Sequence, residues 1–309
     1  MLQFGRAIAL GLLCTILVVG CARDPIPSPR AASYRDSPLR IATWNLEHLA
    51  EANGAGCRPR TDADYEALRS HADRLGADVI AFQEVENAAA AARVFPSDRW
   101  VVVISARPVS GRSGFCRGQS GPMIRTQDVG FAIRRGLSFH RNPDLRELGL
   151  SNPNLRWGVD ITLRLPRPLR LLAVHLKSGC NINRDPNDPD CAVLFAQAPI
   201  LERWADERAR GGEDFAVIGD WNRRTAVLAD EFLGIVSDDD PPAGRLTMAD
   251  AGRRAACIAR YPDFIDHIAL SRSATHRIVA GSFAEHVYGG DERQYPSDHC
   301  PSSVALTSR

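Results

Sequence analysis

The sequence predicts a single mixed α+β domain that follows an N-terminal export signal. Short runs of apolar and β-branched residues, typical of buried strands, are interspersed with two amphipathic helical stretches. From Leu39 to Thr307 there is no internal repeat and no break in composition. One domain is therefore the simplest interpretation, and strand spacing alone leaves the order of the strands open.

The first residues are typical of an export signal. One early charge, Arg6, precedes an apolar run from Ala7 to Gly20 that is short for a membrane span. The run ends in VVGC, which resembles a bacterial lipobox, whose cysteine becomes the lipid-modified first residue of the mature protein. A plain secretory signal with a chance cysteine is the alternative. We expect an exported protein, either anchored to a membrane (in the periplasm or at the cell surface) or secreted, with a signal peptide at 1–20, a lipid anchor at Cys21, a flexible tether at 21–38 and the folded domain at 39–309.

The overall composition points to no particular partner. The chain has 309 residues, 44% of them hydrophobic and 24% charged, and its formal net charge is +1. These values are ordinary for a globular protein and exclude a strong overall field for a nucleic acid or a membrane. A local arginine cluster can still bind phosphate. Nothing indicates a protein partner, and we expect a monomer.

Six cysteines follow the export signal, an even number that indicates disulfide bonds in an oxidising compartment. Cys180 and Cys191 are the favoured pair because they close one short polar loop. Zinc binding is the alternative use, but no two of the six have the close CxxC spacing that favours it. The pairs that then remain are Cys57 with Cys116 and Cys257 with Cys300.

Each element is predicted by its local pattern. The stretch TDADYEALRSHADRLG favours a helix, because Thr61 can cap its start, acidic residues occupy its first turn and Gly76 stops it. A longer amphipathic helix is predicted at 191–210. The segments 105–127 and 236–246 are expected to be loops. Strands are expected, in chain order, at 39–46, 77–85, 99–105, 127–135, 156–165, 169–178, 214–222, 263–271 and in SSVAL near the C-terminus.

Polar side chains recur at the ends of the apolar strands. Gln83 and Glu84 end DVIAFQE, and Asp220 and Asn222 end AVIGDWN. If neighbouring strands pair, these ends converge on one rim that holds acids, amides and histidines. Carboxylates about 5 Å apart repel by a few kcal/mol per pair, and a hard ion such as Mg²⁺ or Mn²⁺ would relieve that repulsion. Histidines beside such a site can exchange protons near neutral pH. The other members of the set are Asn45, His175, Asp266, Asp298 and His299.

Six motifs in chain order resemble the endonuclease/exonuclease/phosphatase superfamily, which includes deoxyribonuclease I, the apurinic endonucleases, bacterial sphingomyelinases and inositol polyphosphate 5-phosphatases. They are TWNLEHL, AFQEVEN, VHLKSGC, GDWN, DFIDHIALS and SDHCP, and they span roughly Leu39 to Leu306. A single motif such as SDH would occur by chance, whereas six in the right order are specific. The resemblance implies a four-layer α/β/β/α sandwich of two packed mixed sheets flanked by helices, with the active rim at one edge.

The resemblance also implies roles for the matching residues. Glu84 matches the principal metal carboxylate, with Asn45 and Asp298 completing or supporting the shell of the ion. The implied ion is Mg²⁺ or Mn²⁺, with Ca²⁺ as a further alternative. Asp220 matches the residue that orients the attacking water, and Asn222 matches the amide that holds a phosphate oxygen.

The two histidines match groups next to the phosphate. The resemblance places His299 beside the scissile phosphate, where Asp266 fixes its tautomer and favours its charged form. It aims His175 at another phosphate oxygen or at the leaving group. The implied chemistry is metal-assisted phosphoester hydrolysis, in which a positioned water attacks in line and fixed donors meet the charge on the equatorial oxygens.

Several residues depart from the family pattern or lie beside it. Trp221 stands where the family usually has Phe, Leu or Met, and strand alternation would turn its ring away from its polar neighbours, so we expect it to pack. Asp128 is a candidate carboxylate partner for His175. Arg156 is expected either to bind a substrate phosphate or to be a solvated strand-edge residue. His267 should face away from the chemistry. The remaining histidines are expected at the surface or in packing: His48, His71, His140, His276 and His286.

The leading functional hypothesis is an exported, divalent-metal-dependent nuclease that hydrolyses phosphodiester bonds of DNA or RNA. The motif HLKSGC after an apolar strand, the export signal and the disulfides fit secreted relatives of deoxyribonuclease. The Arg-rich stretch 105–125 could lie along a nucleic-acid backbone.

Two other functions compete with it. One is a hydrolase of lipid or small-molecule phosphate esters, such as a sphingomyelinase-like phospholipase C, which would need an exposed apolar hairpin for membrane entry. None is obvious in the sequence. The other is a non-enzymatic binding scaffold, which the loss of Glu84, Asp220 or His299 would have favoured, but all three are present.

Overall fold

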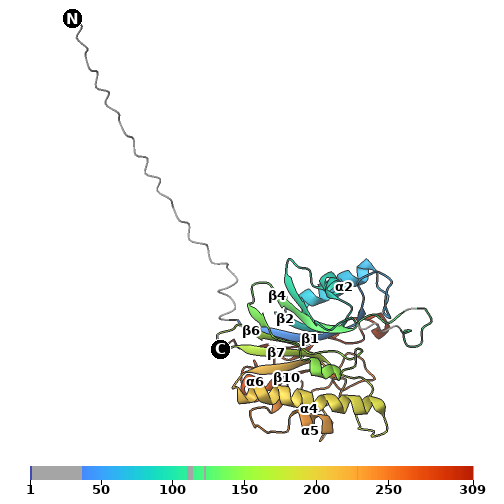
Figure 1. The fold of residues 1–309 in the computed structure, drawn as a ribbon. Helices are drawn as coiled ribbons and strands as arrows, with labels where there is room; N and C mark the ends of the chain where they lie inside the picture. The colour runs from blue at the N-terminus through green and yellow to red at the C-terminus, as the bar shows by residue number, and fades with distance from the viewer. Residues whose placement is uncertain (2–36, 110–113, 122, 228, 309) are drawn as a thin grey trace.

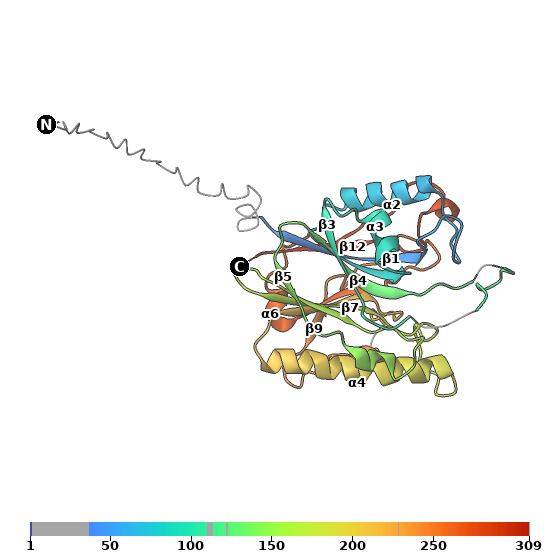
Figure 2. The same ribbon diagram turned by 45° about the horizontal axis from the view of Figure 1, so that its top comes forward.

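Two six-stranded sheets pack face to face, and helices cover the outer side of each (Figures 1 and 2). This computed structural model describes Met1 and residues 37–109, 114–121, 123–227 and 229–308. The expected four-layer α/β/β/α sandwich is therefore confirmed. The expected signal peptide, Cys21 and nearly all of the tether lie outside the described residues. None of the described helices combines the length and apolar character needed to cross a membrane.

The first sheet has the strand order β11-β12-β1-β2-β4-β3. Its central pair, β1 and β2, is parallel, whereas β12 runs antiparallel to β1, and β4 runs antiparallel to both β2 and β3. Helices α2 and α3 cover its outer face (Figure 2). The bounds are β1 (Leu39–Leu49), α2 (Asp62–Arg74), β2 (Val79–Val85), α3 (Ala88–Val94), β3 (Trp100–Ile104), β4 (Asp128–Arg134), β11 (Ala284–Glu285) and β12 (Ser302–Leu306).

The second sheet has the strand order β5-β6-β7-β8-β10-β9. Here β7 and β8 are parallel, and β10 runs antiparallel to β8. Helices α4 and α5 cover the outer face (Figure 1). The bounds are β5 (Phe139–Arg141), β6 (Val159–Leu163), β7 (Leu169–His175), α4 (Pro189–Arg210), β8 (Phe215–Asp220), α5 (Glu231–Val236), β9 (Leu246–Met248), β10 (Asp266–Ser271) and α6 (Arg272–Thr275), with short 3₁₀ turns η1 (Arg146–Gly149) and η2 (Glu292–Gln294).

Strand alternation divides the apolar side chains among three cores. In β1, Ile41 points into the core between the two sheets, and its neighbour Ala42 points into the core under α2 and α3. In β8, Ile218 enters the central core, whereas Val217 packs under α4. Both faces of each sheet are thus buried, which explains why the sequence shows continuous apolar runs instead of clear alternation.

The elements that sequence patterns could not reveal are short. Helix α3 begins at Asn87, whose side chain accepts a hydrogen bond from the Ala90 amide at 2.8 Å, but its alanine-rich sequence has no distinct apolar stripe. Helix α5 and the strands β5, β9 and β11 were also not expected from sequence. The two expected helices are confirmed, and Thr61 and Asp64 pair at the start of α2, with the Thr61 amide donating to the Asp64 carboxylate at 2.7 Å.

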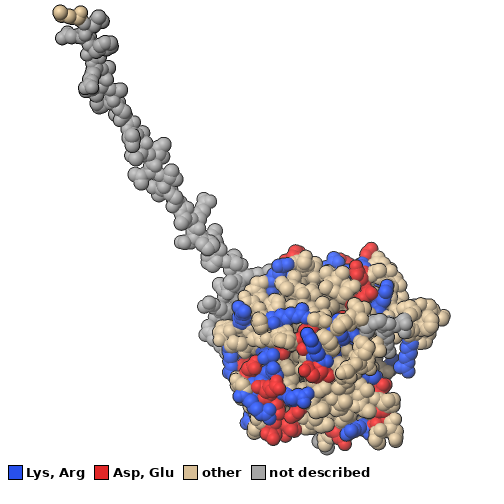
Figure 3. All heavy atoms as spheres, in the orientation of Figure 1, with Lys and Arg blue, Asp and Glu red and all other residues tan. Residues whose placement is uncertain are grey.

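All three expected disulfides are present. The structure pairs Cys180 with Cys191 at the start of α4, and it also contains the two pairs that were expected to remain. On the surface in view in Figure 3, basic and acidic side chains are interspersed, as the net charge of +1 suggests. The other two disulfides are Cys57–Cys116 and Cys257–Cys300.

Gly219 allows the end of β8 to pack closely against β7. Its φ is +148°, and a Cβ placed there would lie 2.0 Å from the backbone oxygen of Val174. We predict that Gly219→Ala lowers the free energy of unfolding by about 2–4 kcal/mol, because one strand must move and the backbone is strained. Urea unfolding measures the change, with Gly234→Ala as the control because its Cβ would meet open space. Equal stability of the two variants would contradict this account.

His71 should make the fold sensitive to acid. It lies in α2 between the rings of Trp44 and Tyr288, and burial, with help from the Arg74 charge, lowers its pKa from 6.5 to about 4. Between these values the unfolded chain binds the proton more readily, so stability should fall as the pH drops from about 6.5 to about 4. We predict that His71→Phe loses less stability than the wild type on acidification from pH 7.5 to pH 4.5, by up to about 3 kcal/mol. Urea titrations at both pH values test this, and equal losses would disprove it.

Candidate active site

Strand ends from both sheets meet at one edge of the sandwich. The parallel strands β1 and β2 end there, as do β7 and β8, while the antiparallel strands β10 and β12 begin there. Within the second sheet, Asp220 lies opposite both His175 and Asp266 in the strand register. The edge therefore gathers, as the sequence predicted, Asn45, Glu84, His175, Asp220, Asn222, Asp266, Asp298 and His299.

A cavity of about 520 Å³ opens at this edge, and we call it the active cavity. Six of the expected site residues are among its lining: Glu84, Arg156, His175, Asp220, Asn222 and His299. Its volume is in the range of small-molecule sites. It is lined by His48, Glu84, Arg117, Ile124, Gln127, Asn152, Asn154, Leu155, Arg156, His175, Lys177, Ser178, Asp220, Asn222 and His299.

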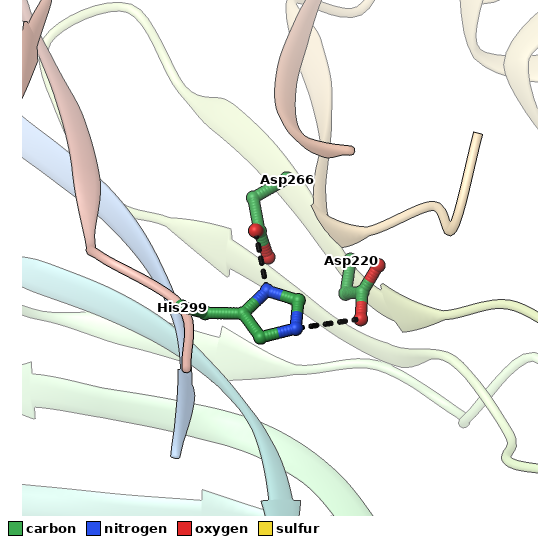
Figure 4. A group of neighbouring side chains, drawn as sticks. All are labelled: Asp220, Asp266 and His299. Carbon is green, nitrogen blue, oxygen red and sulfur yellow. Dashed lines mark hydrogen bonds and ion pairs between the residues drawn. The ribbon is translucent and has the colours of Figure 1, made fainter. Parts of the chain in front are cut away.

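His299 is held between two aspartates (Figure 4). Its Nδ1 lies 2.6 Å from Asp266 Oδ2, and its Nε2 lies 4.0 Å from Asp220 Oδ2. Burial alone would lower the pKa of His299, but the Asp266 and Asp220 carboxylates outweigh it and raise the pKa well above the ordinary value. The imidazole is therefore a cation at neutral pH, with Nδ1–H donating to Asp266 and Nε2–H facing the cavity.

Asp220 is the most constrained carboxylate of the site. It is 2% exposed, it accepts hydrogen bonds from Asn45 Nδ2 at 3.1 Å and from the Asn222 amide at 2.8 Å, and it stands at the end of β8. Burial and the charge of Asp266 raise its pKa to about 7. A carboxylate with such a pKa is suited to accept a proton near neutral pH.

His175 has the opposite character. Its Nε2 lies 3.5 Å from Asp220 and 3.9 Å from Glu84, while its buried Nδ1 has no hydrogen-bond partner within the described part of the chain. Burial lowers its pKa well below the ordinary value, and the charges of Arg156 and His299 lower it further. His175 is therefore neutral, and the proximity of two carboxylates assigns its hydrogen to Nε2.

The prediction that Asp128 is the carboxylate partner of His175 was wrong. Asp128 is bound instead by Arg107, whose Nε and Nη2 lie 2.9 and 2.6 Å from Asp128 Oδ1. Since that guanidinium is itself buried, it supplies the charge that the buried carboxylate requires.

Two roles were expected for Arg156, and the structure excludes one of them, a solvated residue at a strand edge. Arg156 is buried in the wall of the active cavity, where its Nε donates to the His175 carbonyl at 3.2 Å and its Nη2 donates to the Leu176 carbonyl at 2.7 Å. These bonds fix the end of β7. Arg156 thereby brings a positive charge to the cavity and positions His175.

The packing role of Trp221 and the orientation of His267 are confirmed. Trp221 is fully buried under the second sheet, with its ring edge-on to Phe232. The His267 side chain points away from the cavity, and its Nδ1 lies 3.2 Å from Asp250. The contact of His267 Nε2 with the Arg223 carbonyl at 2.8 Å instead holds the chain just after Asn222.

Two residues of TWNLEHL were missed. His48, expected at the surface or in packing, lines the active cavity with Nε2 3.7 Å from Glu84, and its amide donates to Glu84 Oε2 at 3.0 Å. Glu47 accepts a hydrogen bond from the Asp298 amide at 3.0 Å. The signal was present in the sequence, since Glu47 follows Asn45 at the strand period of two.

The acidic groups at this edge fit a hard divalent ion. Burial, together with the negative charge of Asp298, raises the pKa of Glu47 to about 7, although the charges of Arg58 and Arg60 act in the opposite direction. Arg58 lies 3.5 Å from the Glu47 carboxylate, and it offsets the repulsion between the two acids only in part. The same edge carries the side-chain oxygen of Asn45, which accepts from the Glu47 amide at 3.0 Å, and the carboxylate of Glu84, which accepts from the His48 amide at 3.0 Å. Oxygen-rich sets of this kind suit Mg²⁺ or Mn²⁺.

A second grouping at the edge has a different use. Asp220, Asp266 and His299 each place one possible ligand atom within 4.8 Å of the others (Figure 4). His299 Nδ1 is already bonded to Asp266, and the neighbouring carboxylates favour the charged imidazole, a form that has no free lone pair for a metal. This group is better suited to moving and holding a proton.

Backbone strain is concentrated at the site. Glu47, His48, Glu84 and Asn222 have positive φ values of 43°, 53°, 60° and 52°, which non-glycine residues rarely adopt. The β1–β2 pairing also shifts register between Asn45 and Leu49. Irregular backbone of this kind aims side chains out of the sheet edge and commonly marks functional sites.

Comparison with known proteins gives one family. The model of the endonuclease/exonuclease/phosphatase family matches residues 42–299. A search of curated protein sequences finds no match.

Solved structures show the same fold at low sequence identity. TDP2 from Caenorhabditis elegans is 14% identical with a TM-score of 0.60, covering 90% of this chain and 79% of its own. An endonuclease/exonuclease/phosphatase from Bacteroides vulgatus is 14% identical with a TM-score of 0.56, covering 88% and 99%. The catalytic domain of Xenopus laevis APE2 is 15% identical with a TM-score of 0.54, covering 87% and 92%. Since the family model spans most of the chain, from the strand that carries Asn45 to His299, this protein belongs to the endonuclease/exonuclease/phosphatase family of phosphoester hydrolases.

Proposed function

We propose that this protein is an exported, divalent-metal-dependent nuclease that hydrolyses phosphodiester bonds of a polynucleotide. The observation that carries the proposal is the active cavity, which combines a buried carboxylate of raised pKa with a cationic and a neutral histidine. The family description, endonuclease/exonuclease/phosphatase, supports phosphoester chemistry.

Asp220 is the group that accepts the proton of the attacking water. Its carboxylate is fixed on both sides by Asn45 and the Asn222 amide, so its orientation is set before substrate arrives. With a pKa of about 7, it is partly ionised at neutral pH and still basic enough to take a proton. Water held by Asp220 would attack phosphorus opposite the leaving oxygen.

The donors around Asp220 bind the phosphate. Nε2–H of cationic His299 and Nε2–H of neutral His175 both face the region of Asp220. Asn222 adds its side-chain amide, which donates to the Leu176 carbonyl at 3.2 Å in the absence of substrate. Fixed donors such as these stabilise the charge that builds up on the phosphoryl oxygens.

Glu84, Asn45, Glu47 and Asp298 would hold the metal. When bound, the ion would polarise a phosphoryl oxygen and offset the negative charge that accumulates during hydrolysis. The raised pKa of Glu47 supports this assignment, because a divalent cation removes the repulsion between Glu47 and Asp298.

Cations near the cavity favour a polyanionic substrate. Arg117 is exposed, lines the active cavity and comes from the Arg-rich loop that was expected to follow a nucleic-acid backbone. Arg156 adds a buried charge, and Lys177 lies at the cavity with its Nζ 2.7 Å from Asp190. The local cluster compensates for a net charge near zero, since phosphate binding depends on nearby cations.

One observation favours a lipid phosphodiester as a second candidate. The loop between β3 and β4 exposes Val109 by 80%, Phe115 by 67% and Met123 by 38%, and Phe115 pairs with Met123 as a β-bridge. No apolar hairpin was recognised in the sequence, and the structure corrects that interpretation. Exposed apolar side chains on one loop can enter a membrane surface, although Arg117 and Arg125 on the same loop also suit a nucleic acid.

Export remains part of the proposal. The three disulfides fit an oxidising compartment. Anchoring would depend on Cys21, which lies outside the described residues.

We predict that Asp220→Asn and His299→Gln each lower kcat on plasmid DNA or RNA by about 10²–10⁴-fold, because one removes the proton acceptor and the other a charged donor. Initial rates with Mg²⁺ or Mn²⁺ measure this. The controls are Asp98→Asn and His140→Gln, which alter exposed residues away from the cavity. Wild-type rates in both site variants would refute the catalytic assignment, and cleavage of sphingomyelin without cleavage of polynucleotide would refute the substrate.

We predict that chelation with EDTA abolishes hydrolysis and that Mg²⁺ or Mn²⁺ restores it. Glu84→Gln should weaken Mn²⁺ binding by about 10–100-fold, because a carboxylate ligand is replaced by a neutral amide. Paramagnetic resonance of free Mn²⁺ measures the binding independently of activity. Glu66→Gln, on the outer helix α2, is the control. Full activity in EDTA, or equal Mn²⁺ binding by both variants, would contradict the metal assignment.

A further inference from the structure

Trp157 is the one tryptophan that does not belong to a core. All five tryptophans lie in the described ranges, and Trp44, Trp100, Trp204 and Trp221 are at most 4% exposed. Trp157 is half-buried and lines a second cavity of about 610 Å³, which we call the side cavity. A large aromatic side chain at a partly open cavity commonly contacts a ligand. The side cavity is lined by Arg107, Pro108, Val109, Arg146, Glu147, Gly149, Leu150, Ser151, Asn152, Pro153 and Trp157.

The ring of Trp157 is held in place by its neighbours. A Cβ at Gly149 would lie 2.8 Å from Trp157 Nε1, so only glycine lets the chain approach the ring this closely. The Arg146 guanidinium lies 5.2 Å from the ring centroid, within the range of a cation–π contact. The next two residues after Gly149 have the left-handed φ values of 47° and 57°, although neither is glycine. This strain gives the loop a fixed shape beside the ring.

A narrow ridge separates the side cavity from the active cavity. Asn152 lines both cavities, and the consecutive residues Arg156 and Trp157 line one each. Arg107 fixes the ridge, because its Nη1 donates to the Pro153 carbonyl at 2.6 Å while the same guanidinium is bound to Asp128. A ligand that fills the side cavity would therefore adjoin one bound in the active cavity.

The lining selects for a flat group with polar edges. Trp157 offers an aromatic surface for stacking, Pro108, Val109, Leu150 and Pro153 add apolar wall, and Arg146, Glu147, Ser151 and Asn152 supply donors and acceptors. An acyl chain would use none of these donors and acceptors. A cationic headgroup would meet the charge of Arg146 beside the ring. A nucleobase satisfies both needs, since it stacks on aromatic rings and carries hydrogen-bonding edges.

We propose that the side cavity binds the base of a nucleotide adjacent to the scissile phosphate, with Trp157 as the stacking platform. The proposal rests on the proposed nuclease function and adds a subsite to it. Trp157 is a substrate-binding residue in this account and takes no part in proton transfer.

The test compares oligonucleotides with and without a base next to the cleaved bond. For the wild type, removing the base that occupies the side cavity should lower kcat/KM by about 5- to 100-fold, the range of one base–aromatic stack. Scanning single abasic positions around one cleavage site identifies that nucleotide. In Trp157→Ala, the intact oligonucleotide should lose a similar factor, and removal of the same base should cost almost nothing more. Trp157→Phe should retain part of the discrimination.

Tyr261→Ala is the matched control, because Tyr261 is 46% exposed and lines neither cavity. It should keep the wild-type discrimination, and thermal melting should show that all variants are folded. Equal base dependence in wild type and Trp157→Ala would overturn the subsite while leaving the nuclease intact. Failure of the wild type to cleave any polynucleotide would overturn both. Hydrolysis of sphingomyelin with a KM raised by Trp157→Ala would assign the cavity to a lipid headgroup instead.

Discussion

The burial of one carboxylate, Asp220, is the constraint on which the site depends. An isolated buried charge costs several kcal/mol, so its neighbours must either neutralise it or bind it. Here Asn45 and the Asn222 amide donate hydrogen bonds to it, and cationic His299 lies 4.0 Å away. These partners come from β1, from the turn after β8 and from the segment before β12. The carboxylate is therefore stable only if both sheets are assembled, which links the catalytic geometry to the packing of the sandwich.

The edge that carries this carboxylate is kept rigid by contacts that take no part in chemistry. Arg60 is 3% exposed, and its guanidinium donates to the carbonyls of Leu46, Glu47 and Pro296, joining the end of β1 to the segment that precedes His299. The Ser297 hydroxyl donates to the Asn45 carbonyl at 2.7 Å. These contacts explain how the residues of TWNLEHL with positive φ keep their strained backbone, because the surrounding structure stabilises conformations that are unfavourable in isolation.

Sequence alone predicted the long strands, both long helices and the residues of the edge, because buried strands and catalytic motifs leave local patterns. The four-layer arrangement came from the family resemblance, since strand order is not written in local spacing. The sequence did not predict the contacts between distant segments. Asp128 resembled a partner for His175, but its binding by Arg107 depends on a loop whose path no local pattern reveals. His48 was overlooked because a β-bulge, and not strand alternation, turns it into the cavity.

The two histidines show how one residue type serves two purposes in a single cavity. Both are largely buried, and burial by itself would make each neutral. Asp266 is hydrogen-bonded to His299 and favours its cationic form, whereas burial, with the charge of Arg156 acting in the same direction, keeps His175 neutral. A cationic donor and a neutral donor can therefore face the same phosphate without repelling one another strongly. The pairing of β8 with β7 and with β10 places His175 on one side of Asp220 and Asp266 on the other. His299, which precedes β12 of the first sheet, reaches Asp266, so the packing of the two sheets determines the charge pattern at this edge.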